Sequence, residues 1–268
     1  MLNETVRRTL DLRGTNGDVG IEIEMEGPSP FPNTTAEFEW NSTEDGSLRG
    51  HGKEYVSKRP VSISKVDEHL DKLKKHIKSG GASITKSFRA GVHCHVNVQQ
   101  LTLKQMYIFA VLYFTLEPTL MKYCGPTREG NLFCLRVKDA EYHVKLLEDA
   151  LDVDNIYNLR SDRIRYASIN FNALFKYGSL EFRGMETNPD FSKISDWAKL
   201  LVLLRNTAKQ IECCRVIADD ISAGGPLEWA RSILGDEYFS VLKYEGMDYD
   251  IMSSMRNLQY LIYHPELN

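Results

Sequence analysis

The chain has 268 residues, with 33 Lys or Arg against 37 Asp or Glu and a formal net charge of −4. At about 100–200 residues per domain, this length fits one large domain or two small ones. Contents of 42% hydrophobic and 26% charged residues exclude a chain that is mainly disordered, collagenous or coiled-coil. The slight negative charge does not fit a broad nucleic-acid-binding surface, so no nucleic-acid partner is expected.

The cysteines and the apolar runs of the sequence indicate the cellular compartment in which the protein is expected. The five cysteines are odd in number and form no CxxC pair, so neither a disulfide framework nor a structural zinc site is expected. The first residues lack the apolar segment of a signal peptide, and the longest apolar run, 106–116, is too short to cross a bilayer. We therefore expect a soluble, reduced, cytoplasmic protein with no membrane partner. The sequence does not indicate its oligomeric state.

Five segments predict β-strands, because their residues alternate in polarity or form short β-type runs. These segments are residues 19–26, 53–56, 90–99, 166–174 and 179–183.

Apolar residues at helical spacing predict four main helices between and after these strands. They begin after Ser64, at the capping pair Thr102 and Gln105, near Lys138 and near Ser192. The helix from Ser192 is expected to be the longest and to continue to about Ala218, with shorter helices over 226–235 and 252–263. This order lacks regular β-α-β alternation. The expected class is therefore α+β, an antiparallel sheet with helices on one face and the other face open.

The first predicted strand places three glutamates on one face. In residues 20–26, Glu22, Glu24 and Glu26 alternate with apolar side chains. Like charges this close repel one another, and a bound Mg²⁺ would relieve the repulsion because it favours carboxylate oxygens. The alternative is a solvated outer face of an edge strand.

The strand at 90–99 carries His93, His95 and Asn97 on one face and Cys94 among valines on the other. An HxH pair on a strand fits metal ligands or groups that face phosphate. A zinc site would need a further ligand, which the spacing does not select, and a structural role for the pair stays open.

The late strand puts Glu181 and Arg183 on one face, and Arg165 lies just upstream of the strand expected at 166–174. In that upstream strand, Ser168, Asn170 and Asn172 are expected to share a face. Between the first two polar strands, Asp45 begins an Asp-Gly pair that reads by itself as a turn.

Together these strands would gather acids, histidines and arginines into one charged groove on the open face of the sheet. Acids for Mg²⁺ and cationic side chains for oxyanions are typical of a phosphoryl-transfer site. The sequence contains neither a GxxxxGK[ST] loop nor a protein-kinase motif set, so metals and side chains would hold the phosphate.

The order of these motifs resembles the amidoligase family of the glutamine synthetase-like carboxylate–amine ligase superfamily, which is related to glutamate–cysteine ligase. The resemblance covers about Gly17 to Leu204. The motifs that carry it are Gly20-x-Glu22-x-Glu24, Asp45-Gly46-Ser47-Leu48, Gly52-x-Glu54-x-Val56-Ser57, Gly91-Val92-His93-x-His95-Val96, Arg165 with Asn170, and Glu181-Phe182-Arg183.

The resemblance implies a glutamine synthetase-like catalytic domain whose open sheet face binds ATP and Mg²⁺. It implies a ligase that activates a carboxylate as an acyl phosphate and then forms an amide with an amine. The two partners would be small-molecule or peptide substrates, which the sequence does not identify. Residues 1–16 would form an N-terminal arm, 17–218 the catalytic domain and 219–268 a helical extension.

The resemblance also implies roles for individual residues. The implied metal ligands are Glu22, Glu24, Asp45, Glu54, His93 and Glu181. The implied catalytic residues are Arg165, Arg183 and His93. The implied nucleotide-binding residues are His95, Asn97, Arg165, Asn170 and Arg183.

Two alternatives remain open from the sequence. One is an ATP-dependent phosphotransferase of the same superfamily, resembling a guanidino kinase. The other is a non-catalytic module that retains the fold, although a complete set of acids argues against a decayed site.

Overall fold

A single antiparallel sheet forms the centre of the molecule in the computed structural model, which describes residues 2–139 and 141–268. Its strand order is β2-β3-β1-β4-β6-β5, with every neighbouring pair antiparallel. The strands are β1 (Val19–Met25), β2 (Trp40–Thr43), β3 (Lys53–Ser57), β4 (Gly91–Asn97), β5 (Ile169–Asn170) and β6 (Ser179–Glu186). The α+β class predicted from the sequence is confirmed.

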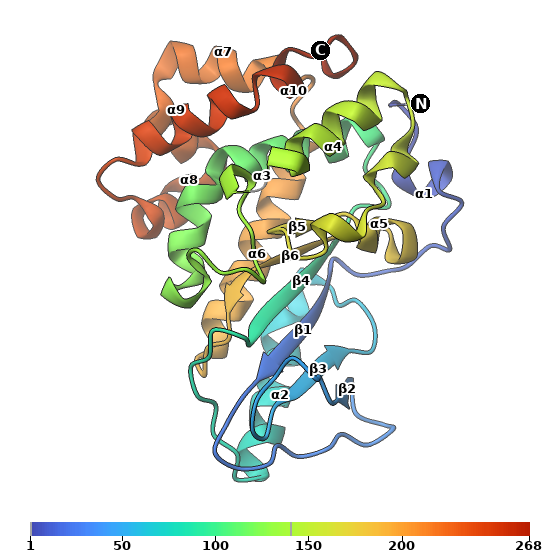
Figure 1. The fold of residues 1–268 in the computed structure, drawn as a ribbon, viewed down its shortest axis with the longest axis vertical. Helices are drawn as coiled ribbons and strands as arrows, with labels where there is room; N and C mark the ends of the chain where they lie inside the picture. Colours follow the sequence, from blue (N-terminus) through green and yellow to red (C-terminus); the bar gives the residue numbers. More distant parts are fainter. Residues whose placement is uncertain (1, 140) are drawn as a thin grey trace.

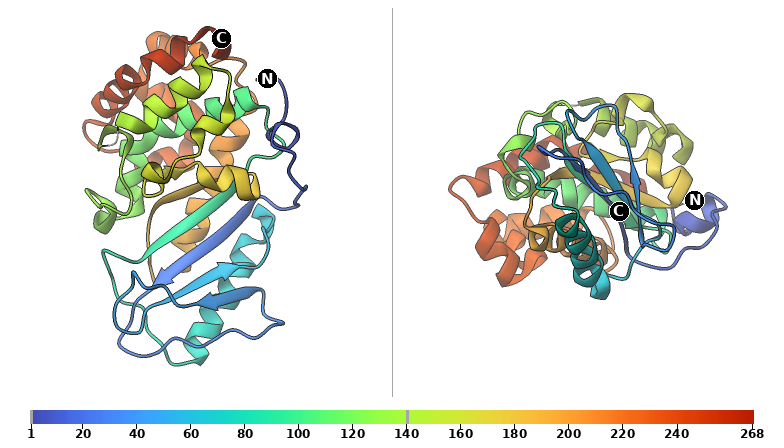
Figure 2. Two further views of the ribbon diagram at one scale, coloured as in Figure 1. Left: turned by 45° about the vertical axis from the view of Figure 1, so that its right-hand side comes forward. Right: turned by 90° about the horizontal axis from the view of Figure 1, so that it is seen from below.

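Most of the helices lie around the β4-β6-β5 half of the sheet, whereas α2 lies beside the β2-β3-β1 half (Figure 1). Figure 2 shows the same division from two other directions. The helices are α1 (Val6–Thr9), α2 (Val66–Ser79), α3 (Leu103–Cys124), α4 (Glu141–Asp152), α5 (Asn172–Tyr177), α6 (Phe191–Ala208), α7 (Arg215–Gly224), α8 (Pro226–Leu242), α9 (Met247–Asn257) and α10 (Gln259–Tyr263). None of the helices in the described part of the chain is long and apolar enough to cross a membrane.

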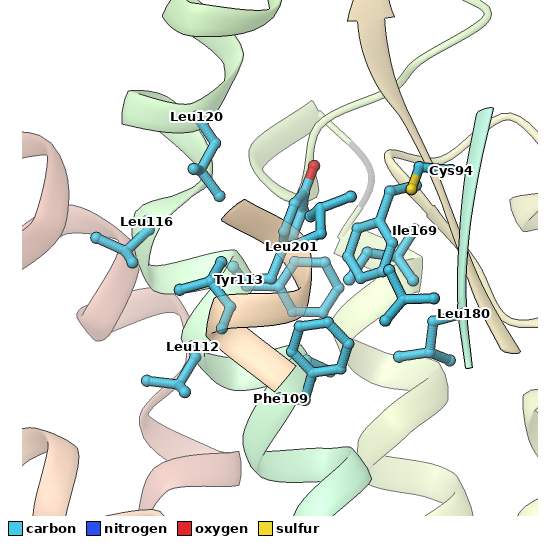
Figure 3. Packing of buried hydrophobic residues seen from close by; sticks show 14 of the residues in the cluster. Cys94, Phe109, Leu112, Tyr113, Leu116, Leu120, Ile169, Leu180 and Leu201 are labelled. Carbon is cyan, nitrogen blue, oxygen red and sulfur yellow. The ribbon is translucent and has the colours of Figure 1, made fainter. Parts of the chain in front are cut away.

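Alternation along the strands decides which face of the sheet is covered. Ile21, Ile23 and Cys94 are at most 1% exposed and belong to the main hydrophobic core. Phe182 of β6 packs against the α3 rings of Phe109, at 5.3 Å between centroids, and Tyr113, at 4.9 Å. Figure 3 shows the same core from close by, with side chains of α3 facing those of the sheet. The glutamates of β1 are left on the opposite, open face.

Helix α3 is the longest helix, with 22 residues, and is buried almost all around. It begins at the capping box predicted from sequence, in which Thr102 and Gln105 satisfy each other's backbone N–H groups. Because the helix contacts the sheet on one side and α9 on another, its surface is apolar in nearly every direction. The helix expected from Lys138 is α4, which begins at Glu141; residue 140 lies outside the described part.

The single long helix expected from Ser192 to Ala218 is wrong, because the chain breaks between α6 and α7. No proline or glycine marks this break in the sequence. Tertiary contacts start the second helix: the Cys214 N–H donates to the Leu267 carbonyl and the Arg215 N–H to the Asn268 side chain. Cys213 therefore lies half-buried between the two helices rather than inside one helix, whereas Cys214 is buried.

The strand expected over 166–174 is also mostly wrong, since only Ile169–Asn170 pairs as β5. Asn172 begins α5, and its side chain bonds the backbone of Ser161 in both directions. Ser168 points into the helix layer, where it donates to Glu117, while Asn170 points to the open face. The three polar residues therefore do not share a face.

Candidate active site

Strand pairing brings the predicted acids and histidines together on the open face. Glu22 of β1 lies opposite His93 of β4, and Glu24 lies opposite Glu54 of β3. The next strand places Glu181 of β6 opposite His95. Residues as far as 86 positions apart in the sequence, His95 and Glu181, thus become direct neighbours in the sheet.

His93 lies at the centre of this group and is only 3% exposed. Its Nδ1 is 3.2 Å from Glu22 Oε2 and 3.6 Å from Glu181 Oε1, and its Nε2 is 3.6 Å from Glu24 Oε1. Nε2 makes no hydrogen bond in the structure. The His93 ring therefore lies between three carboxylates but forms a hydrogen bond with Glu22 alone among them.

Two overlapping sets of side chains have the spacing of metal ligands. Glu22, His93 and Glu181 form one set, and Glu24, Glu54 and His93 form the other, with one ligand atom from each residue within 4.8 Å of its partners. Carboxylate oxygens with one imidazole nitrogen fit Mg²⁺ or Mn²⁺ better than a thiolate-seeking metal. The residues present therefore fit the metals that the resemblance implies.

Two of the remaining predicted acids are placed differently. Asp45 lines the same cavity but stands outside both ligand sets, and its carboxylate accepts the Ser47 N–H at 2.7 Å in a turn. Glu26 lies beyond the end of β1, where its carboxylate accepts the Arg49 N–H.

The charges of the cluster are strongly coupled. Burial by itself would raise the pKa of Glu22, but the hydrogen bond with His93 and the ion pair with His95 outweigh it and hold the pKa well below its usual range. Glu22 in turn raises the pKa of His95 against the opposing effect of burial. Burial, followed by the charge of Glu22, raises the pKa of Glu54. The cluster thus contains one carboxylate that ionises easily, Glu22, and one that resists ionisation, Glu54.

Arginines face these acids across a cavity of about 330 Å³. Arg183 donates to Glu181 and lies 3.5 Å from His93 Nδ1, while Asn170 donates to the other Glu181 oxygen at 2.7 Å. Arg165 lies at the exposed edge, with its guanidinium 4.4 Å from the Tyr166 ring centre. The predicted arginines and Asn170 are therefore beside the acids.

Sequence reasoning missed two further arginines of this cavity, Arg89 and Arg128. Arg89 precedes β4 and donates to the Ser47 carbonyl at 2.9 Å. Arg128 is 1% exposed and donates to the Arg183 carbonyl at 2.8 Å. Arg89 lies just before β4, and Arg128 ends a short 3-10 helix after α3. Neither segment carries a readable motif, so only the positions of β4 and α3 could have indicated these arginines.

A second, larger cavity of about 940 Å³ lies at the other end of β1 and β4, and Glu22 lines both cavities. His95 lines it with the Tyr177 ring edge-on at 5.8 Å between centroids. Asn97 lines it too, but its amide donates to the carbonyls of Thr15 and Gly17. The side chain of Asn97 therefore holds the N-terminal segment that forms a wall of this cavity.

Comparison with known proteins identifies one family. The model described as "Putative amidoligase enzyme" matches residues 57–204, which is more than half of the chain. The match includes His93, Glu181 and Arg183, whereas the acids of β1 and β3 precede it. A search of curated proteins finds no match.

Proposed function

Because the chain belongs to the amidoligase family, a family of ligase-type enzymes, we propose that it is an ATP- and Mg²⁺-dependent carboxylate–amine ligase. The observation that carries the proposal is the cluster around His93, in which Glu22, Glu24 and Glu181 meet beside Arg183. Acids for divalent cations and arginines for oxyanions are the groups that phosphoryl transfer to a carboxylate needs.

The two ligand sets would hold the metals. Glu22, His93 and Glu181 form one site, and Glu24, Glu54 and His93 form the other. Divalent cations bound there would offset the negative charge that gathers on the transferred phosphoryl group.

The two cavities differ in size and charge, which supports one arrangement of the substrates. The 940 Å³ cavity is large enough for a nucleotide and carries the cations Arg13, Lys58, Arg59 and Lys176, with Tyr177 available for stacking on a base. The 330 Å³ cavity fits a smaller substrate. Since Glu22 lines both, the terminal phosphate of a nucleotide in the larger cavity reaches the cluster.

The reaction then has two steps. A carboxylate oxygen attacks the γ-phosphorus of ATP, the bond to the bridging β–γ oxygen breaks, and ADP leaves with an acyl phosphate remaining. The amine nitrogen attacks the acyl carbon, the carbon–oxygen bond to phosphate breaks, and the nitrogen loses a proton. Arg183 would hold the oxyanion during both steps. Glu181 accepts a hydrogen bond from Arg183 and another from Asn170, and so fixes the position of the guanidinium.

The test is incubation with ATP, Mg²⁺ and mixtures of amino acids or short peptides, with ADP release and new masses as readouts. A ligase releases ADP only when a carboxylate and an amine are both present. With an ¹⁸O-labelled carboxylate, one label should appear in the released phosphate, because the acyl–oxygen bond breaks in the second step. ADP release with a single phosphoryl acceptor would indicate the phosphotransferase instead, and the absence of nucleotide binding would indicate a non-catalytic module.

A further inference from the structure

Two strongly exposed apolar side chains flank the small cavity. Leu132 is 75% exposed and Phe88 is 72% exposed, the largest fractions of any large hydrophobic side chain among residues 2–139 and 141–268. Neither side chain takes part in the hydrophobic core of the described residues. Single apolar side chains on a surface are common, whereas neighbouring ones beside a cavity indicate a binding surface.

The loops that carry these two side chains are tied together by Asn131. Its amide donates to the Phe88 carbonyl at 2.7 Å and to the Thr127 carbonyl at 2.8 Å. Its Oδ1 accepts the Phe133 N–H at 2.9 Å, which fixes the turn that presents Leu132. Phe88 and Leu132 therefore belong to one surface, which we call the entrance patch.

The entrance patch is continuous with the small cavity. Arg89 and Phe133, the residues that directly follow the two patch residues, both line the cavity. The Phe133 ring meets Tyr166, another lining residue, edge-on at 5.6 Å between centroids. An apolar surface therefore runs from inside the cavity to the patch outside it.

The patch is within reach of a short peptide whose carboxylate reacts at the His93 cluster. Phe88 precedes His93 by five positions, at most about 18 Å of extended chain. A nucleotide in the larger cavity would fill the side of the cluster at Glu22, so the body of the carboxylate substrate has to leave through the small cavity. At about 330 Å³ this cavity holds only the reacting end of a peptide, and the rest would lie against the patch.

The charges beside the patch restrict its partner further. Lys86 and Arg165 are exposed, and Arg89 is half-buried at the cavity. Glu129, the acid nearest in sequence to the Leu132 turn, is paired with Arg136 at 3.6 Å. Positive charge therefore surrounds the patch, and it would repel a lysine or arginine next to an apolar residue of the partner.

We infer that the carboxylate substrate is a peptide with a large apolar side chain within about five residues of the reacting carboxylate, and that Phe88 and Leu132 bind this side chain. This inference rests on the proposed function and narrows its substrate class. A second copy of the chain on the patch would cover the entrance through which the substrate must pass, so we assign the patch to the substrate.

The test compares peptides that differ at one position. N-acetylated pentapeptides ending in Glu, which offers a side-chain and a main-chain carboxylate, would carry Leu or Ser at one of the first four positions and Gly at the others. They would be titrated by calorimetry into the intact protein with Mg²⁺ and a non-hydrolysable ATP analogue. We expect Leu to bind about tenfold tighter than Ser in at least one position, the effect of burying one apolar side chain. Lys next to that Leu should lower the affinity several-fold, and less so at high salt.

Variants of the patch should remove the preference for Leu without destabilising the fold. The double variant Phe88→Ser with Leu132→Ser should bind the Leu and Ser peptides equally and keep the melting temperature of the parent, because neither side chain supports the core. Val241→Ser is the matched control. It removes an apolar side chain that is 66% exposed and lies outside the cavity, and should keep the preference.

Four outcomes would contradict the inference. Equal affinities of the parent for Leu and Ser peptides, with nucleotide binding intact, would overturn it and leave the ligase proposal standing. A preference that survives in the double variant would place the apolar side chain elsewhere. A dimer in sedimentation experiments that dissociates in the double variant would assign the patch to a second copy of the chain. Failure of the parent to bind the ATP analogue would overturn both the inference and the ligase proposal.

Discussion

Two glutamates are buried on opposite sides of the sheet, and their surroundings shift the pKa of the carboxylate in opposite directions. Glu181 on the open face is 5% exposed and Glu117 in the helix layer is 3% exposed. Burial acts to raise the pKa of Glu181, but His95, His93 and Arg183 together lower it. Burial raises the pKa of Glu117 to about 7, although Ser168 and the Val137 N–H donate to its carboxylate. Neutral donors alone do not keep a buried carboxylate ionised, whereas neighbouring cations do.

The largest effect should come from removing one acid of the open face. Glu24→Gln should lower Mg²⁺- and ATP-dependent turnover by a hundredfold or more, on the order of losing one group that stabilises transition-state charge. The unliganded variant should be as stable as the parent or slightly more stable, because one of several crowded like charges is removed. Mg²⁺ with ATP should raise the melting temperature of the parent much more than that of the variant. A destabilised variant that stays active would contradict the metal assignment.

The second prediction concerns Glu117, the carboxylate in the helix layer. Replacing it should change the stability of the protein, and the change should grow as the pH rises. The folded-state pKa of Glu117, about 7, lies above the ordinary value of 4.5, so its ionisation disfavours the folded state. This penalty is absent below pH 4.5, grows towards pH 7 and is complete above it. Between pH 5 and pH 8, Glu117→Gln should therefore gain on the order of 2–3 kcal/mol of unfolding free energy relative to the parent.

Urea titrations at the two pH values measure this difference. The exposed Glu237→Gln serves as the matched control and should follow the parent at both. Equal gains for Glu117→Gln at pH 5 and pH 8 would show that Glu117 is ionised in the folded protein.

A smaller effect should come from Asn97, which lies at the end of the open face that borders the larger cavity. Asn97→Ala removes two hydrogen bonds to the segment at 15–17, each worth about 1 kcal/mol. Because that segment lines the larger cavity, we expect the KM for ATP to rise several-fold with kcat nearly unchanged. Trypsin should also cut faster after Arg13. A fall in kcat with normal trypsin resistance would place Asn97 in the chemistry instead.

The smallest effect should come from the thiols. Cys94 faces the core, and burial raises its pKa to about 12, so the reactive thiolate is scarce at neutral pH. Brief alkylation of the native protein should label the half-buried Cys213 first and leave turnover unchanged. Rapid inactivation through Cys94 that ATP prevents would reopen a thiol mechanism.

Much of the open face was predictable because strand alternation is a local property. The period of two residues assigns Glu22 and Glu24 to one face and Ile21 and Ile23 to the other before any tertiary contact is known. The same reasoning failed at 166–174, where Asn172 begins α5 and Ser168 turns towards Glu117. There the backbone leaves the sheet after two residues, so alternation no longer describes the side chains.

The sequence by itself determined the strand faces, the start of α3 at its capping box and the kinds of side chain available for the site. Each of these depends on residues close together in the chain, so spacing alone decides it. Only the tertiary structure decided that His93 lies between three carboxylates and that the chain breaks between α6 and α7. It also decided that Arg128 is buried with its Nε and NH1 groups free of hydrogen bonds. These features depend on strand register, on contacts with the last residues of the chain and on a loop packed against Gly91, none of which leaves a periodic pattern in the sequence.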